Sequence, residues 1–387
     1  EEQAVDLNAL LQRCAGAVAV RDTRAASDLL IRIRQHSSPR GGPAERVAHH
    51  FAVGLDARLA GEGTELYAAS SANRIYAAEM LRAYKALIHA APFRRVSNML
   101  ANKTVWRAAV EARAKKLHVI DFGILYGFQW PCLIHILSTM AGGPLKLRLT
   151  GIDFPQPGFR PAERVAQSGV RLAKYCRRFG VPFEYNAIAR KWETITVEDL
   201  KIEEGELLVV NTLYRFKNVP NESSSVMTVS SSPRDTVLSL INKINPDLFI
   251  LGVTNGTLDS PFFVTRFREA LFQYSCLFDM LDATMKREDE DRLFLEGHLY
   301  RMEALNIVAC EGTQRVERPE TYKQWHARTK RAGLRQLPFY EEDLKYIMSK
   351  VKEDYHRDFS LAEDGKWFLQ GWKGRVLYAM SIWKPAN

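Results

Sequence analysis

The chain has 387 residues, of which 46% are hydrophobic and 26% are charged, an ordinary balance for one large or two average globular domains. No eighteen apolar residues run together, which excludes a transmembrane helix, and the opening EEQAVDLNAL lacks the basic and apolar regions of a signal peptide. The net charge of +9 suits a polyanionic partner, and no membrane partner is expected.

Residues 1–115 predict a helical region that caps the rest of the chain. Apolar residues recur at helical spacing, and the later segments are rich in alanine. The LNALL of Leu7 to Leu11 matches an L-x-x-L-L docking helix, but three leucines on one face also suit a bundle core, and we assign them to the core. The predicted helices are Leu7–Val18, Thr23–Ile33, Glu45–Leu59, Ala72–His89 and Val96–Ala114.

Residues 116–387 predict an α/β core. Short apolar runs alternate with amphipathic segments, a pattern that indicates right-handed βαβ units and a parallel sheet covered on both faces. We expect a helical insertion near 261–310, a helix over Glu341–Lys352 and a closing hairpin within 367–384. The fold class is therefore Rossmann-like, with a mostly parallel sheet like that of class I methyltransferases and a helical cap. The five apolar runs are LHVID, LKLRLTGID, FEYNAIA, ELLVVNTLY and PDLFILGVTNG.

A cofactor-type pocket is expected where the parallel strands end. After the first strand, Asp121, Gly123 and Gly127 match three positions of an Asp-x-Gly-x-Gly-x-Gly turn, but Leu125 replaces the middle glycine. The second strand ends on Asp153, where such folds hold a ribose diol. The fourth ends on Asn211-Thr212-Leu213-Tyr214, so Asn211 and Tyr214 complete the set. We interpret the pocket as inherited geometry that no longer serves the cofactor.

The sequence contains no motif of the common hydrolase, zinc-protease or nucleotide-hydrolysing classes. G-x-S-x-G, H-E-x-x-H and P-loop motifs are missing, and the nine histidines form no ligand cluster, so no metal is expected. His118 lies inside the first predicted strand and is assigned to the fold. The five cysteines are scattered, with no C-x-x-C, which argues against a disulfide framework and predicts a reducing compartment.

Two segments concentrate the positive charge. Residues 160–191 hold eight Lys or Arg against two acids, and residues 315–335 hold seven against two. Either segment alone is best interpreted as a solvent-exposed helix face, but the two together could form a surface that binds phosphates. The candidate DNA-binding residues are Arg171, Arg177, Arg178, Arg328, Lys330, Arg331 and Arg335.

Nearly the whole chain resembles the plant GRAS proteins, and its motif sequences are most similar to those of the scarecrow-like branch. The VHIID block is matched by LHVIDFGILYGFQWPCLIHIL, and the second leucine-rich region by RLAKYCRRFGVPFEYNAIARKWETITVEDL. The PFYRE block is matched by PFFVTRFREALFQYSCLFDML, and the SAW block by ACEGTQRVERPETYKQW with the final tryptophans. The first leucine-rich region then falls within 1–115. The signature residues of the VHIID block are Leu117, His118, Val119, Ile120 and Asp121.

The resemblance implies a nuclear regulator of plant transcription that associates with DNA and with other regulators, often as a homo- or heterodimer. It implies neither methyl transfer nor a cofactor. Because the chain begins without methionine, we expect it to be a domain of a longer protein. Two alternatives stay open: an S-adenosylmethionine-dependent methyltransferase using Asp121, Gly123, Gly127 and Asp153, and a partner-binding scaffold that does not itself contact DNA.

Overall fold

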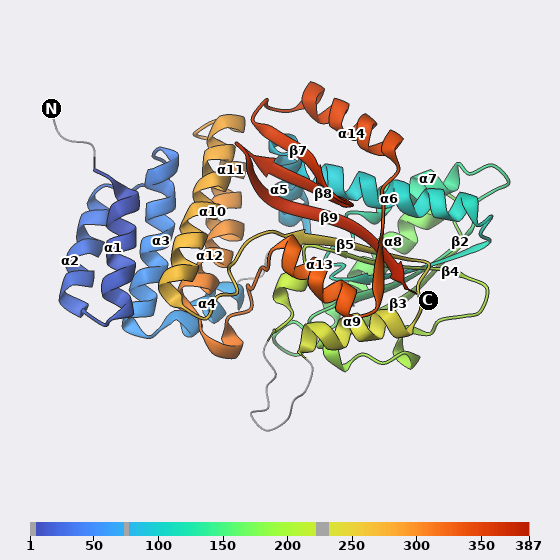
Figure 1. The fold of residues 1–387 in the computed structure, drawn as a ribbon, viewed down its shortest axis with the longest axis horizontal. Coiled ribbons are helices and arrows are strands. Elements are labelled where there is room, and N and C mark those ends of the chain that lie inside the picture. Colours follow the sequence, from blue (N-terminus) through green and yellow to red (C-terminus); the bar gives the residue numbers. More distant parts are fainter. Residues whose placement is uncertain (1–4, 73–76, 222–231, 387) are drawn as a thin grey trace.

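A helical cap and a nine-stranded sheet lie side by side in the computed structural model, which describes residues 5–72, 77–221 and 232–386 (Figure 1). The strand order is β3-β2-β1-β4-β5-β9-β8-β7, with β6 also paired to β9. Strands β3 to β5 run parallel along this order, and β9 is antiparallel to β5. The predicted Rossmann-like, methyltransferase-like class is therefore confirmed. The strands are β1 (Lys116–Phe122), β2 (Lys146–Asp153), β3 (Phe183–Ala189), β4 (Leu207–Leu213), β5 (Leu248–Thr254), β6 (Leu334–Leu337), β7 (Phe359–Asp364), β8 (Trp367–Trp372) and β9 (Arg375–Pro385).

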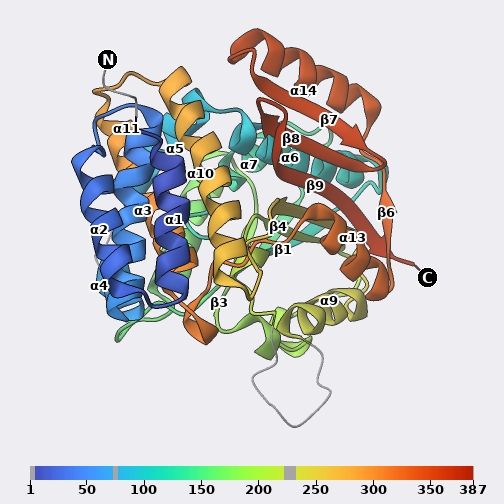
Figure 2. The same ribbon diagram turned by 60° about the vertical axis from the view of Figure 1, so that its left-hand side comes forward.

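The central strands are buried on both faces, as apolar runs in a parallel sheet require. All residues of β1 from Leu117 to Phe122 are buried. One face is covered by α6 (Phe93–Glu111), α7 (Trp130–Ser138), α8 (Glu163–Arg178) and α14 (Glu341–Asp354). The other is covered by α9 (Pro233–Lys243) and α13 (Tyr322–Arg331), with short 3₁₀ turns at Trp192–Thr194 and Glu198–Leu200. Figure 2 shows α14 above the antiparallel strands, and α13 and α9 below them.

Local sequence explains where several helices begin. The Ser232 side chain accepts a hydrogen bond from the Asp235 amide, and Pro233 takes the first helical position of α9. Thr321 and Gln324 form a reciprocal capping box at the start of α13. These caps satisfy backbone amides that have no partner within the helix.

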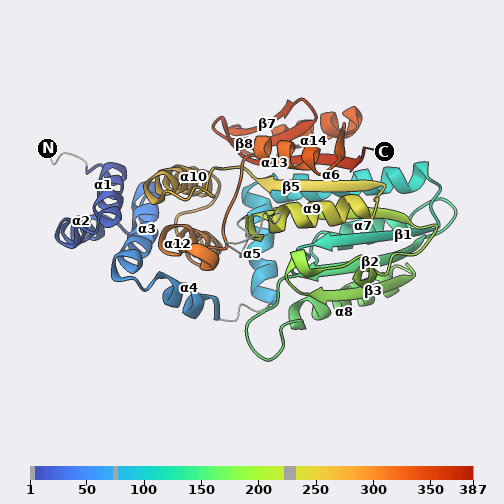
Figure 3. The ribbon, with the colours of Figure 1, turned by 60° about the horizontal axis from the view of Figure 1, so that its bottom comes forward.

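The cap combines two segments that are far apart in the sequence. Its first part is α1 (Leu7–Ala19), α2 (Thr23–Gln35), α3 (Pro43–Ala60), α4 (Gly63–Ala72) and α5 (Ala77–Ala90). Its second part is α10 (Phe263–Thr284), α11 (Glu290–Phe294), the π-helical turn Leu295–Tyr300 and α12 (Arg301–Ala309). Both parts share one hydrophobic cluster. Figure 3 shows that α5 is the cap helix nearest to the strands, with α10 and α12 behind it.

The packing divides the chain differently from the predicted boundary at residue 115. Helix α6 precedes that boundary, but most of it packs against the sheet, on the same face as α14. The insertion near 261–310 instead packs with the N-terminal helices. The predicted helix Ala72–His89 corresponds to α5, and its residues 73–76 lie outside the described residues. The leucines of LNALL are buried in the cap, as expected.

The C-terminal hairpin is present as β8 and β9, and a third strand, β7, pairs with β8. All five cysteines are free thiols. No helix within the described ranges is long and apolar enough to cross a membrane.

A buried ion-pair cluster joins the two parts of the cap. Arg46 on α3 has a fully buried side chain, and its Nε lies 3.1 Å from both carboxylate oxygens of Glu296. Its Nη1 donates to Asp282 on α10 at 2.8 Å, and the Gly41 and Phe278 carbonyls accept its remaining bonds. The guanidinium therefore fixes α3 against α10 and the π-helical turn.

We expect Arg46→Ala to lower the free energy of unfolding by about 3–5 kcal/mol, because the buried Glu296 loses its ion-pair partner. The matched control is Arg34→Ala, since Arg34 and Asp56 form an ion pair whose side chains are 50% and 51% exposed. That change should cost less than about 1 kcal/mol. Urea denaturation measures both, and equal losses would contradict the role assigned to Arg46.

Candidate functional site

The predicted pocket residues meet where β1, β2 and β4 end. Asp121 on β1 is in register with Gly151 on β2 and with Asn211 on β4. The strand order reverses between β1 and β4, which is the position where open α/β sheets bind ligands. Gly123 and Gly127 have positive φ angles of 97° and 70°, which glycine adopts without steric cost, so both residues are needed for the shape of the turn.

Asp121 is held from within the protein. Trp130 Nε1 donates to one of its carboxylate oxygens and Asn211 Nδ2 to the other, each at 2.8 Å. The pKa of Asp121 is raised to about 7, because burial, with a smaller contribution from the nearby Asp153, outweighs the two hydrogen bonds, which lower it. Both acceptor oxygens of this carboxylate are thus already in use.

Asp153 is likewise occupied, although it stands where related folds bind a ribose. Arg164 Nε and Nη2 lie 3.1 and 2.7 Å from Oδ2, and Phe154 N donates to Oδ1 at 2.9 Å. Arg215 Nη2 is 3.7 Å from Oδ1. A diol would have to displace these partners.

The space beside the glycine turn is also taken. A Cβ atom added to Gly123 would meet Arg215 Cγ at 2.3 Å, so this side chain lies directly against the turn. Leu125, at the position of the missing glycine, has φ 50° and lines the cavity, as its place in the motif predicted. Such a left-handed residue costs about 1–2 kcal/mol. Ser168 Oγ offsets part of this cost by donating to the Leu125 carbonyl at 2.7 Å.

Tyr214 and His118 are part of the framework. The Tyr214 ring is buried, and its hydroxyl bonds to Ser97 and to Gln370 Nε2 on β8. His118 Nδ1 lies 2.7 Å from Glu206, and Nε2 lies 2.8 Å from Thr150 Oγ1. Burial lowers the pKa of His118. The assignment of His118 to the fold is therefore confirmed.

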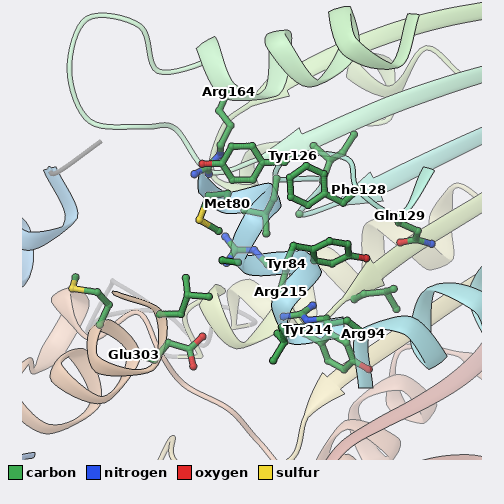
Figure 4. Close-up of a pocket in the computed structure, with 18 of the residues that line it drawn as sticks. Met80, Tyr84, Arg94, Tyr126, Phe128, Gln129, Arg164, Tyr214, Arg215 and Glu303 are labelled. Atoms are coloured by element: carbon green, nitrogen blue, oxygen red, sulfur yellow. The ribbon is translucent and has the colours of Figure 1, made fainter. Parts of the chain in front are cut away.

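A cavity of about 990 Å³ opens between the strand ends and the cap (Figure 4). Helix α5, the start of α6, the loop before α7 and the turn after β4 line it on one side. The π-helical turn and the start of α12 line the other. Its volume is near the upper end of small-molecule sites, which measure roughly 300–1,000 Å³. The described residues contain no group of three or more side chains suited to a metal ion.

The candidate DNA-binding residues fall into separate groups. Arg177 and Arg178 are exposed at the end of α8, and Lys330, Arg331 and Arg335 are exposed at the end of α13 and on β6. Helices α8 and α13 cover opposite faces of the sheet. One continuous surface formed by all seven residues, as the charge count suggested, is therefore not present.

Arg328 and Arg171 hold the fold together, which corrects their assignment as DNA contacts. The Arg328 side chain is 11% exposed and bonds to Glu320 at 2.8 and 2.9 Å and to Asp235 at 2.9 Å. Arg171 is half-buried, and its Nη2 donates to Ser168 Oγ at 2.8 Å. Charge density along a sequence cannot distinguish a paired arginine from a free one.

Sequence reasoning missed three of the arginines that line the cavity, Arg94, Arg164 and Arg215. Arg164 lies within the basic segment 160–191, and Arg215 directly follows the predicted Tyr214, so both lie close to features that the sequence had already marked. Arg94 precedes the predicted helix that starts at Val96, and the sequence gives no sign that it meets the strand ends.

Comparisons with known proteins place these features in a family. A model of the GRAS domain family matches residues 7–384. Scarecrow-like protein 14 of Arabidopsis thaliana is 54% identical over 388 residues, which cover 100% of this chain and 50% of that protein. Scarecrow-like transcription factor PAT1 of Arabidopsis thaliana is 31% identical over 98% of this chain and 76% of that protein. The chain spans about half the length of several curated relatives.

A solved structure agrees with the fold. The crystal structure of SCL7 in Oryza sativa has a TM-score of 0.79 and 26% sequence identity to this chain. The match covers 98% of this chain and 100% of that one. Both the cap and the sheet are therefore shared.

Asp121 yields a prediction for pH. Its folded-state pKa lies above the unfolded value, so its protonated form favours folding, and this stability is present at low pH and lost as pH rises through about 7. We expect wild-type protein to lose about 2 kcal/mol through this group between about pH 5.5 and 8. Asp121→Asn should abolish that loss in urea denaturation.

Asp343→Asn is the control. Hydrogen bonds from Arg107 and Lys103 lower the pKa of Asp343 against the opposing effect of burial, so this group stays ionised throughout the range. Its replacement should change stability equally at both pH values. Identical pH profiles for wild type and Asp121→Asn would refute the role assigned to Asp121.

Proposed function

The chain belongs to the GRAS domain family, and on that premise we propose that it is a plant nuclear transcription regulator that associates with DNA and with other regulators. Dimer formation, as a homo- or heterodimer, is part of the proposal. The name of a relative, Scarecrow-like transcription factor PAT1, supports the regulatory role.

The observation that carries the DNA proposal is the basic surface formed by Lys330, Arg331 and Arg335, here called the α13–β6 surface. All three residues are exposed, and none of them forms an ion pair within residues 5–72, 77–221 and 232–386. Lys384 on β9 lies directly opposite Arg335 on β6 and adds a further positive charge. Free cations of this kind bind phosphates and release condensed counterions.

Lys330 and Arg331 also lie in the last turn of α13, where a positive charge stabilises the helix dipole. This structural role is compatible with binding phosphates, because both charged groups remain exposed to solvent. Arg177 and Arg178 on α8 form a second, smaller group on the opposite face. A single duplex contact at the α13–β6 surface would leave the α8 group free for a protein partner.

The test is fluorescence anisotropy of a labelled DNA duplex titrated at several salt concentrations. Each lost phosphate contact flattens the slope of log K against log salt by about 0.9, so Arg331→Gln with Arg335→Gln should flatten it by roughly 1.8. The matched control is Arg177→Gln with Arg178→Gln, which removes equal charge from the other face and should leave the slope unchanged.

Each other outcome has a definite meaning. A flattened salt slope in the Arg177→Gln, Arg178→Gln variant alone would show that the DNA contact lies on α8. Absence of binding at low salt would leave a partner-binding scaffold without DNA contact. Arg328 is unsuitable for this test, because its removal would strip Glu320 and Asp235 of their partner.

Methyl transfer is not proposed, because the groups that would bind S-adenosylmethionine are already bound. Arg164 occupies Asp153, and Arg215 lies against Gly123. We expect calorimetric titration with S-adenosylmethionine to give no binding heat. Micromolar binding that disappears in Asp153→Ala would establish the methyltransferase alternative instead.

A further inference from the structure

The cavity between cap and sheet contains two arginines with unused hydrogen-bonding capacity. Arg94, in the first turn of α6, stacks on the Tyr214 ring with its guanidinium carbon 4.6 Å from the ring centroid. No hydrogen bond or ion pair joins Arg94 to any other part of the chain that the structure describes. Arg215 Nε is buried without a hydrogen-bond partner.

Two acids near these arginines already have other partners. Asp153 is the carboxylate nearest to Arg215, but at 3.7 Å it is already bound by Arg164. Glu303, across the cavity, lies 2.6 Å from Lys217 and accepts a hydrogen bond from Tyr274 at 3.1 Å. A buried donor without a partner is costly and calls for a missing acceptor.

Flat aromatic surfaces stand beside the two arginines. Tyr126 and Phe128, in the loop before α7, stack with centroids 5.5 Å apart and planes within 16°. Tyr84 on α5 meets Phe128 with centroids 5.0 Å apart. All three side chains line the cavity and are only half-buried, so faces remain for another ring (Figure 4).

We propose that this cavity binds a small organic acid, whose anionic group contacts Arg94 and Arg215 and whose flat apolar body packs on Tyr84, Tyr126 and Phe128. Arginine binds such groups through its planar fork of donors, and aromatic faces bind rings with little loss of side-chain entropy. The ligand is distinct from a nucleoside cofactor, because Asp153 is not free to bind a diol. The site is also independent of the α13–β6 surface.

The test uses two fluorescent probes that share a ring system. One is 1-anilinonaphthalene-8-sulfonate, whose sulfonate stands in for a carboxylate, and the other is the uncharged N-phenyl-1-naphthylamine. We expect the anionic probe to bind saturably at one site per chain and at least about tenfold more tightly than the neutral one, the gain typical of a charge-assisted hydrogen bond.

Variants separate the acid site from the ring site. Arg94→Gln should weaken the anionic probe roughly tenfold and leave the neutral probe within about twofold, because only the charged contact is lost. Phe128→Ala should weaken both probes. Arg177→Gln, an exposed charge on α8, should affect neither.

Arg94 is the better residue to replace. Arg215→Gln could disturb the turn at Gly123, whereas Arg94 has no ion pair to lose. The thermal unfolding midpoint of the Arg94→Gln variant shows whether it is still folded. Unchanged binding of both probes by Arg94→Gln overturns the proposal. Failure of the anionic probe to bind wild-type protein saturably overturns it as well, whatever the outcome with DNA.

Discussion

The ion pair between Asp153 and Arg164 determines the character of the strand ends. A carboxylate after the second strand is the feature by which a sheet of this kind binds a ribose. Here Arg164 binds that carboxylate from the first turn of α8, and Arg215 fills the space beside Gly123. The sheet therefore keeps the geometry of a cofactor fold while its recognition groups serve the protein itself. What remains open is the part of the cavity that faces the cap.

The cap is the second determinant of the site. Residues of α5 and of the π-helical turn line the cavity together with the strand ends, so the cavity has walls that a bare sheet lacks. Arg46 holds the π-helical turn against α10 by binding Glu296 and Asp282 at once. The phosphate-binding candidates lie elsewhere, at the end of α13 and on β6. A ligand site and a nucleic-acid surface on separate elements can accept different partners at the same time.

Much of the fold could be predicted, since apolar runs of five to eleven residues identified the parallel strands, and polar residues ending them identified Asp121, Asp153 and Asn211. The edge strand β7 was missed because its last three residues are exposed and the run SLAED carries no apolar alternation. The joining of α10–α12 to α1–α5 depends on contacts between distant segments, which periodicity does not report. The same holds for Arg328, whose partner Asp235 lies 93 residues away, and for Arg94, whose neighbour Tyr214 lies on another element.

The divided cap also constrains how the chain folds as it is made. Arg46 and Glu296 are 250 residues apart, so at about 5–20 residues per second the ribosome delivers the partner of Arg46 roughly 12–50 s later. Phe51, which packs against Phe267 and Tyr274, waits almost as long with its ring uncovered. During that interval all five parallel strands emerge. The N-terminal helices therefore wait with part of their apolar surface uncovered, and the cap can close only after the five parallel strands have been synthesised.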